Sequence, residues 1–348
     1  CLNINEQNHL TIGGCDTVEL ARTYGTPLFV MDETAIRGAL AAYKRSIDEN
    51  YENGGMVAFA SKACSFKELY RLVMEEGCGA DVVSGGELYT AMQVGFPAER
   101  VFFHGNNKSE AELRMALDYG VGRIVVDNMF ELERLSALAK EMGKTAHIYL
   151  RITPGIDAHT HSFIRTGQID SKFGFTMENG DALKGVKAAL AAEGVELMGI
   201  HCHIGSQIFD EQPFIHAAEV MLTFMAQIRK ETGVTLRELN LGGGFGIRYV
   251  AQDDPKALES YMEQLTSNVA GMENADVTRE MEEERQSKQK ITVLPPEALE
   301  KAYTYVELNF GKTYLTPAEE KRMNHLMCRG IHGDCSLYFT EGILKNPV

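Results

Sequence analysis

Short apolar runs alternate with longer amphipathic stretches between about residues 25 and 250. The runs are rich in β-branched and aromatic residues, and most end at Gly, Ser, Asp or His, as buried parallel strands do. They lie at Leu28–Val30, Met56–Ala60, Asp81–Val83, Val101–Phe103, Ile124–Val126, Ala146–Ile152, Leu197–Ile200 and Leu239–Leu241. Intervening stretches such as 109–119 and 130–142 carry apolar residues at helical spacing. Ser109 and Glu112 form a capping-box signature at the start of the first of these. The alternation predicts βα units around a parallel sheet.

A doubly wound sheet and a (β/α)8 barrel both fit this alternation. Polar residues or glycine stand directly after successive runs, at Lys62, Ser84, His104, Asp127, Arg151, His203 and Gly242. In a barrel all these loops meet at the C-terminal mouth, where sites are built, whereas a doubly wound sheet uses only the loops at its switch point. The pattern favours a TIM-like barrel with seven convincing βα units. We expect its eighth strand to be poorly formed or supplied by Ile291–Leu294.

The character of the chain changes after about residue 265. Residues 273–290 have almost no apolar anchors, which predicts a solvated helix or a linker, with a binding tail as the alternative. We therefore expect a barrel domain at residues 1–265 and a charge-rich helical tail of unknown role at residues 266–348.

Composition narrows the function classes. The chain has 348 residues, 44% of them hydrophobic, which is ample for a buried core. Its net charge of -15 argues against binding nucleic acid or an anionic membrane. No apolar run approaches the roughly 20 residues that span a bilayer, and no signal peptide opens the chain. The seven cysteines contain no Cys-x-x-Cys pair, so neither a zinc ribbon nor a disulfide framework is indicated. We expect a cytoplasmic enzyme.

Lys62 is the first candidate for chemistry. A lysine just beyond a buried strand projects into a barrel mouth, where desolvation lowers the pKa of its amine and makes it a nucleophile for an aldehyde cofactor. A surface lysine that opens a loop is the alternative reading. The position of this lysine relative to the other candidates decides between the two.

Two further segments contain candidate ligand-binding residues. The turn Gly242-Gly-Gly-Phe-Gly follows a late strand, where barrels most often bind phosphate, and its backbone N–H groups can converge on an anion. A tight turn without a ligand is equally compatible. The segment His201-Cys-His203-Ile-Gly-Ser206 offers imidazoles and a hydroxyl. Metal ligation is the obvious alternative, but no third ligand stands at a telling spacing. His203 is the stronger candidate, and His201 is interpreted as a packed strand residue.

Together these segments resemble a known enzyme family. In order, the chain reads Phe-Ala-Ser-Lys62-Ala, Ala-Asp81-Val-Val-Ser-Gly-Gly-Glu87-Leu-Tyr, His104-Gly-Asn-Asn-Lys-Ser, Arg151-Ile-Thr-Pro-Gly, Thr166-Gly-Gln-Ile-Asp-Ser-Lys172-Phe-Gly-Phe, His201-Cys-His203-Ile-Gly-Ser206-Gln and Gly242-Gly-Gly-Phe-Gly. The series resembles the diaminopimelate decarboxylases, which are pyridoxal-phosphate enzymes of fold type III with an alanine-racemase-like barrel. The resemblance extends from the N-terminus to about residue 265.

The resemblance implies pyridoxal 5'-phosphate as cofactor and conversion of meso-2,6-diaminopimelate to L-lysine and carbon dioxide. Lys62 matches the lysine that holds the cofactor as a Schiff base, and His203 matches the histidine that stacks on its ring. These two are the expected catalytic residues. The other expected cofactor-binding residues are Asp81, Glu87, Arg151, Ser206, Gly243 and Gly244, the last three at phosphate-binding positions. Lys172 lies in the family's Ser-Lys-Phe-Gly segment, and no metal is implied.

The chain departs from the family beyond residue 265. It contains neither the Glu-Pro-Gly-Arg segment, whose carboxylate lies beside the cofactor's ring nitrogen, nor the Cys-Glu-Ser-Gly-Asp segment of the C-terminal β-domain. Because the family's homodimer uses that domain, the sequence does not predict a dimer here. Two explanations of this departure are favoured: a decarboxylase front joined to a foreign end, and a truncated relative that binds cofactor without decarboxylating. A tail that restores the missing groups is the less favoured explanation. We therefore expect impaired decarboxylation. The alternatives are a non-catalytic cofactor-binding or interaction protein and, less favoured, an amino-acid racemase.

Overall fold

Seven parallel strands form the curved sheet at the centre of the molecule. The computed structural model describes residues 2–51, 55–156, 173–258, 260–265 and 335–339. The strands are β4 (Gly55–Ala60), β5 (Gly79–Val82), β6 (Val101–Phe103), β7 (Arg123–Val126), β8 (Ala146–Thr153), β10 (Val195–His201) and β11 (Glu238–Gly242). Each pairs in parallel with the next in that order. A short strand, β9 (Phe175–Thr176), pairs in parallel with the end of β8. The prediction of seven barrel strands is confirmed.

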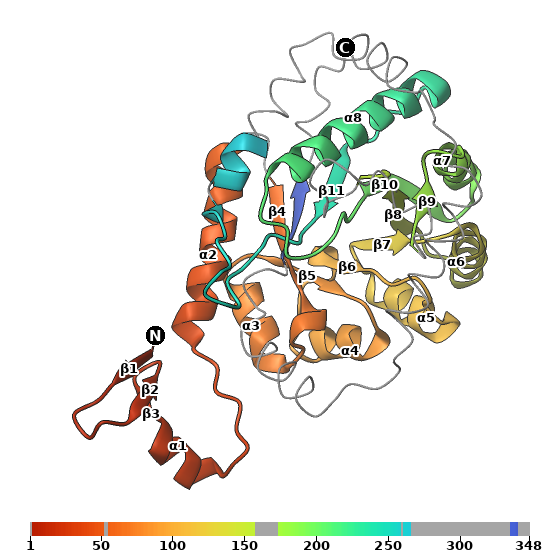
Figure 1. Cartoon of the computed structure of the whole chain (residues 1–348). Coiled ribbons are helices and arrows are strands. Elements are labelled where there is room, and N and C mark those ends of the chain that lie inside the picture. The colour runs from red at the N-terminus through yellow and green to blue at the C-terminus, as the bar shows by residue number, and fades with distance from the viewer. Residues whose placement is uncertain (1, 52–54, 157–172, 259, 266–334, 340–348) are drawn as a thin grey trace, which may run out of the picture.

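An antiparallel strand fills the eighth position of the ring. β12 (Cys335–Phe339) pairs antiparallel with both β11 and β4 and lies between them in Figure 1. Residues 291–294, the expected source of an eighth strand, lie outside the described residues. The edges of β4 and β11 present backbone N–H and C=O groups, and a strand of either direction can satisfy them. The barrel therefore departs from a regular (β/α)8 barrel at this one position.

Helices cover the outside of the barrel (Figure 1). They are α2 (Glu33–Asn50), α3 (Lys67–Glu75), α4 (Gly85–Gln93), α5 (Glu110–Tyr119), α6 (Met129–Met142), α7 (Asp181–Ala191) and α8 (Gln212–Thr232), with short 3-10 turns η1 (Ser61–Ala63) and η2 (Ala98–Arg100). Ser109 and Glu112 form the expected capping box at the start of α5. The main hydrophobic core lies between these helices and the strands, where Phe59, Leu69 and Val73 are buried. No described helix has the length and hydropathy that crossing a membrane requires.

The N-terminal elements stand apart from the barrel. They comprise β1 (Leu2–Ile4), β2 (Leu10–Ile12), β3 (Cys15–Asp16) and α1 (Thr17–Tyr24), and Figure 1 shows them at one side of the molecule. The expected strand at Leu28–Val30 is wrong, because this run has no regular structure and Phe29 is 68% exposed. An apolar run forms a strand only where a neighbouring strand accepts its hydrogen bonds, and this run pairs with no described strand.

Alternation along the strands fills the barrel interior in layers. Ala58, Phe102, Val125 and Tyr149 form a small apolar cluster of their own, and the rings of Phe102 and Tyr149, on strands that are not neighbours, lie 6.2 Å apart. Below it, Arg123 of β7 pairs with Glu238 of β11 across the barrel. Because side chains alternate, the residues two positions beyond the cluster also face inward. Those residues are Ala60, His104, Asp127 and Arg151, and the last three form a polar layer at the mouth.

Candidate active site at the barrel mouth

Lys62 lies in η1, directly after β4, and its side chain is exposed. The expectation of a buried amine is therefore wrong, while the expected position beyond a buried strand is confirmed. Its neighbour Ser61 is buried, and the Ser61 hydroxyl lies 2.8 Å from the carbonyl oxygen of Asp81 and 3.1 Å from the carboxylate of Glu87. These contacts fix the turn that carries Lys62 to β5 and α4.

Glu87 links two loops of the mouth. Its Oε2 atom accepts a hydrogen bond of 2.6 Å from the backbone N–H of Val83, in addition to its contact with Ser61. Ser84 caps the helix that carries Glu87 by accepting from the Glu87 N–H. In this structure Glu87 therefore holds the turns after β4 and β5 together.

Asp81 and two histidines form the next part of the polar layer. Asp81 is 5% exposed, and its Oδ1 atom lies 3.4 Å from Nε2 of His104. The His104 ring meets the ring of His201 edge-on, at 4.8 Å between centroids. His201 is buried, as its interpretation as a packed strand residue requires, and burial holds its pKa well below the ordinary value. Both imidazoles and one carboxylate thus lie close together in the polar layer.

His203 is neutral at neutral pH. Burial is the main cause that lowers its pKa to about 4, and the positive charges of Lys62 and Arg151 lower it further. Arg151 and His203 line one pocket. Lys62, from a third strand end, lies near enough for its charge to lower the pKa of His203. A neutral imidazole is suited to lie flat against an aromatic ligand without a charge to solvate.

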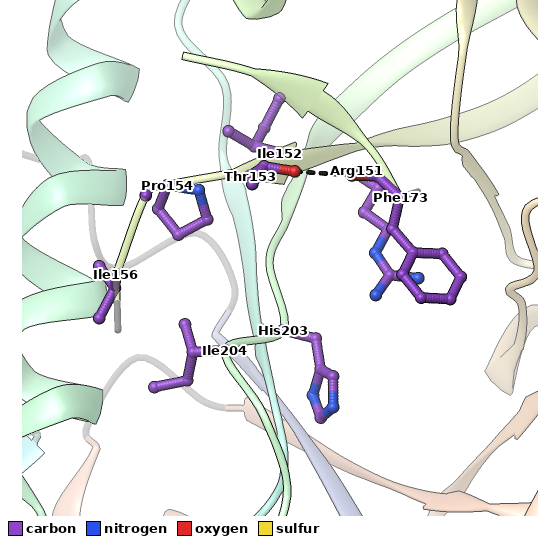
Figure 2. Close-up of a pocket in the computed structure, with 9 residues that line it drawn as sticks. Arg151, Ile152, Thr153, Pro154, Ile156, Phe173, His203 and Ile204 are labelled. Atoms are coloured by element: carbon purple, nitrogen blue, oxygen red, sulfur yellow. Dashed lines mark hydrogen bonds between the residues drawn. The ribbon is translucent and has the colours of Figure 1, made fainter. Parts of the chain in front are cut away.

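Arg151 lies in a pocket beside His203. The pocket is lined by residues 151–156 together with Phe173, His203 and Ile204. Figure 2 shows the Arg151 guanidinium against the Phe173 ring, whose centroid lies 4.2 Å from it, with His203 on the neighbouring segment. Nη1 of Arg151 is 3.8 Å from Oδ1 of Asp127, a buried oxygen without a hydrogen-bond partner among the described residues. Burial raises the pKa of Asp127. This pocket therefore contains a partly buried cation covered by an aromatic ring.

Glycines bring the loops after β10 and β11 together. Gly244 has φ of 113°, and a Cβ there would lie 2.0 Å from the carbonyl oxygen of Gly205. The same Cβ position is 3.4 Å from Cα of Ser206. The exposed residue Ser206 therefore lies beside the buried glycine turn that contains Gly243 and Gly244. Hydroxyl and backbone N–H groups are donors that suit a phosphate.

The sequence analysis missed the buried ion pair of Lys108 and Glu131. The Lys108 ammonium donates to the carbonyl oxygens of Gly105 and Val125, each at 2.7 Å, and to Glu131 Oε1 at 2.6 Å. The other oxygen of Glu131 accepts from the N–H of Asp127 at 2.9 Å. The pair fixes the ends of β6 and β7. The sequence offered two signals for this pair: Lys108 lies in the His104-Gly-Asn-Asn-Lys-Ser segment, and Glu131 lies among the apolar positions of α6. Lys172 lies outside the described residues.

Comparison with known proteins identifies the class. The family model "Pyridoxal-dependent decarboxylase, pyridoxal binding domain" matches residues 35–285. The chain therefore belongs to the pyridoxal-dependent decarboxylases, and the resemblance noted in its motifs is confirmed.

Diaminopimelate decarboxylases are among the similar relatives within that class. The chain is 49% identical to that of Bacillus methanolicus over 266 residues, which are 76% of this chain and 61% of the relative. It is 48% identical to that of Bacillus subtilis over 268 residues, which are 76% of this chain and 60% of the relative. The crystal structure of the M. jannaschii enzyme in complex with L-lysine superposes with a TM-score of 0.73 at 36% identity, covering 78% of this chain and 63% of that one. The chain thus spans about three fifths of the length of these relatives.

Proposed function

We propose that this chain is the cofactor-binding barrel of a diaminopimelate decarboxylase, which converts meso-2,6-diaminopimelate to L-lysine and carbon dioxide. The observation that carries the proposal is the convergence of Lys62, His203 and the glycine turn after β11 on one barrel mouth. The names of the relatives and the L-lysine bound in the M. jannaschii structure support the choice of substrate. A cytoplasmic location is part of the proposal.

The residues of the mouth fit pyridoxal 5'-phosphate. Ser206 with the backbone of Gly243 and Gly244 would hold the phosphate, and the contact of Gly244 with Gly205 leaves no room for a Cβ at residue 244. His203 would lie against the pyridine ring, and Lys62 would bond the aldehyde carbon through its amine. When bound, the cofactor supplies a sink for the electrons that remain when carbon dioxide departs.

The other expected cofactor-binding residues act around these. Asp81 contacts His104 and places a carboxylate in the polar layer. Glu87 binds Ser61 and so fixes the turn that carries Lys62. Arg151 keeps a guanidinium between Phe173 and Asp127, where its charge favours the neutral form of His203. We infer that Arg151 orients the ring side of the cofactor and excludes water from it.

The test of the cofactor site is covalent labelling. Borohydride reduction of the protein with bound cofactor, followed by peptide mapping, should place the pyridoxyl group on Lys62, because its amine lies at the mouth beside His203. Lys62→Met should abolish the label, and Lys67→Met, a change to an exposed lysine of α3, should leave it unchanged. A label on another lysine with Lys62 unmodified would contradict the assignment.

A non-catalytic cofactor-binding protein is the second candidate. It is favoured by the absence of a Glu-Pro-Gly-Arg segment and by the antiparallel strand β12 in the eighth position of the barrel. The visible spectrum of the purified protein separates the two candidates. A cofactor band that meso-diaminopimelate leaves unchanged supports the second candidate, and a band that changes with release of lysine supports the first.

A further inference from the structure

The residue that follows Ser206 has an unusual backbone conformation. Gln207 has φ of 57°, in the left-handed region that few residues other than glycine adopt. Asn8, the other described non-glycine residue with positive φ, lies between β1 and β2, far from the barrel mouth. Such conformations persist where the surrounding structure imposes them, and they cluster at functional sites. The contacts of Gln207 show what imposes this one.

The side chain of Gln207 is bound at both ends to a single residue of the opposite loop. Its Nε2 atom donates to the carbonyl oxygen of Ile247 at 2.9 Å, and its Oε1 atom accepts from the N–H of Ile247 at 2.9 Å. This pair of hydrogen bonds fixes both the orientation of the carboxamide and its distance from the backbone of Ile247. Gln207 therefore ties the loop after β10 to the loop after β11.

The same two loops are joined by a short backbone ladder. The N–H of Ile208 donates to the carbonyl oxygen of Gly244 at 3.0 Å, and the N–H of Gly246 donates to the carbonyl oxygen of Ile208 at 2.8 Å. The ladder adjoins both the Gln207–Ile247 contact and the close approach of Gly244 to Gly205. Ser206 and Gly244 are thus held at a distance that the Gln207 side chain helps to set.

We propose that Gln207 is a positioning residue for the phosphate of the cofactor, which acts by fixing Ser206 against the glycine turn at residues 243–244. The inference rests on the proposed binding of pyridoxal phosphate. Gln207 acts through its neighbours, so its contribution depends on the phosphate and is absent for pyridoxal, which has the same ring and aldehyde without that group.

The test compares Gln207→Glu with the wild type and with Gln93→Glu. Glutamate keeps the length of the side chain but places a carboxylate oxygen against the carbonyl of Ile247, which removes one hydrogen bond and adds repulsion. Gln93 is exposed at the last residue of α4, at the opposite end of the barrel from the mouth, so its variant carries the same chemical change without the contact. The dissociation constants of pyridoxal phosphate and of pyridoxal are measured by absorbance titration.

We expect Gln207→Glu to bind pyridoxal phosphate about 10- to 100-fold more weakly, as loss of a polar partner at a partly buried contact does. Pyridoxal binding should change by less than about 2-fold, which is less than the loss of a typical hydrogen bond, and Gln93→Glu should match the wild type. Equal weakening of both ligands would mean a general structural role and would overturn the proposal, as would unchanged binding of pyridoxal phosphate.

A second variant covers a failure to fold. Gln207→Asn has a side chain that tolerates the left-handed backbone but is one methylene too short to reach Ile247. If circular dichroism shows that Gln207→Glu is unfolded, the same titrations are made with Gln207→Asn. Unfolding of both variants would overturn the positioning role.

If the wild type binds no pyridoxal phosphate, the proposed function fails, and titration with inorganic phosphate then decides the role of Gln207. Weaker phosphate binding by the variant supports the role, and equal or absent binding overturns it.

Discussion

At the mouth of the barrel, His203 combines burial with two nearby cations, and its pKa of about 4 lies below the ordinary value of 6.5. As the pH falls below 6.5, the unfolded chain binds a proton that the folded chain still excludes. The folded state is therefore destabilised progressively between pH 6.5 and about 4, by up to about 1.4 kcal/mol per pH unit for one fully shifted group. Below pH 4 both states bind the proton, and His203 contributes no further change.

A substitution of Lys62 tests this account of His203. Lys62→Met removes a positive charge near the imidazole, so the pKa of His203 should rise, although burial keeps it below 6.5. Titration of the histidine resonances by NMR measures the shift. Lys140→Met, which changes an exposed lysine of α6 paired with Glu193, is the matched control and should leave His203 unchanged. An unchanged pKa in Lys62→Met would show that the two side chains are not neighbours.

Among the elements, the ends of β6 and β7 depend on the buried pair of Lys108 and Glu131. Burial lowers the pKa of Lys108 and raises that of Glu131, while their mutual attraction opposes both shifts. Removing one partner leaves a buried charge without compensation. We expect Lys108→Met alone, or Glu131→Leu alone, to lower the free energy of unfolding by about 3–5 kcal/mol.

The double variant Lys108→Met/Glu131→Leu should recover a large part of that loss, because an apolar pair of similar volume carries no desolvation cost. Urea denaturation measures all three variants. The exposed pair of Lys140 and Glu193 provides the comparison, since removing either partner there should cost no more than about 1 kcal/mol. Additive losses in the double variant would show that the two residues act independently.

The strands of the barrel were predictable because each pairs on both edges and is buried on both faces. Their apolar runs therefore end where the polar mouth begins, as at Ile124–Val126 before Asp127. The run at Leu28–Val30 has the same composition but pairs with no described strand, and composition cannot reveal pairing. Lys62, His203 and the glycine turn were predictable as mouth residues for the same reason. Two contacts could not be predicted: that of the Phe173 ring with Arg151, and the ion pair of Lys108 and Glu131. Both depend on contacts between segments distant in sequence.

At the scale of the whole molecule, closure of the ring was the least predictable feature. β12 lies more than 90 residues after β11 and runs against the direction of its neighbours, so no βα pattern announces it. Its hydrogen bonds cover the edges of β4 and β11 that a seven-stranded sheet would expose. In a (β/α)8 barrel, however, the loop after the eighth parallel strand contributes to the mouth. β12 runs in the opposite direction to such a strand.

This difference leads to a prediction for catalysis. The chain should bind the cofactor through Lys62, yet release carbon dioxide from meso-diaminopimelate far more slowly than the Bacillus methanolicus relative assayed alongside it. The family's Glu-Pro-Gly-Arg segment, which keeps a carboxylate at the ring nitrogen, does not occur in the sequence. Loss of one well-placed electrostatic group typically costs on the order of 10²–10³ in rate.

The assay measures carbon dioxide release from protein that is monodisperse by light scattering and that carries the pyridoxyl label on Lys62 after reduction. Those two conditions separate slow chemistry from aggregation and from an empty site. The Michaelis constant is measured together with the turnover number. The resemblance implies that the arginine of the Glu-Pro-Gly-Arg segment binds substrate, so its loss should raise the Michaelis constant, while loss of the carboxylate should lower the turnover number. Turnover equal to that of the relative would show that residues beyond 265 rebuild the missing groups by a route that the family's motifs do not contain.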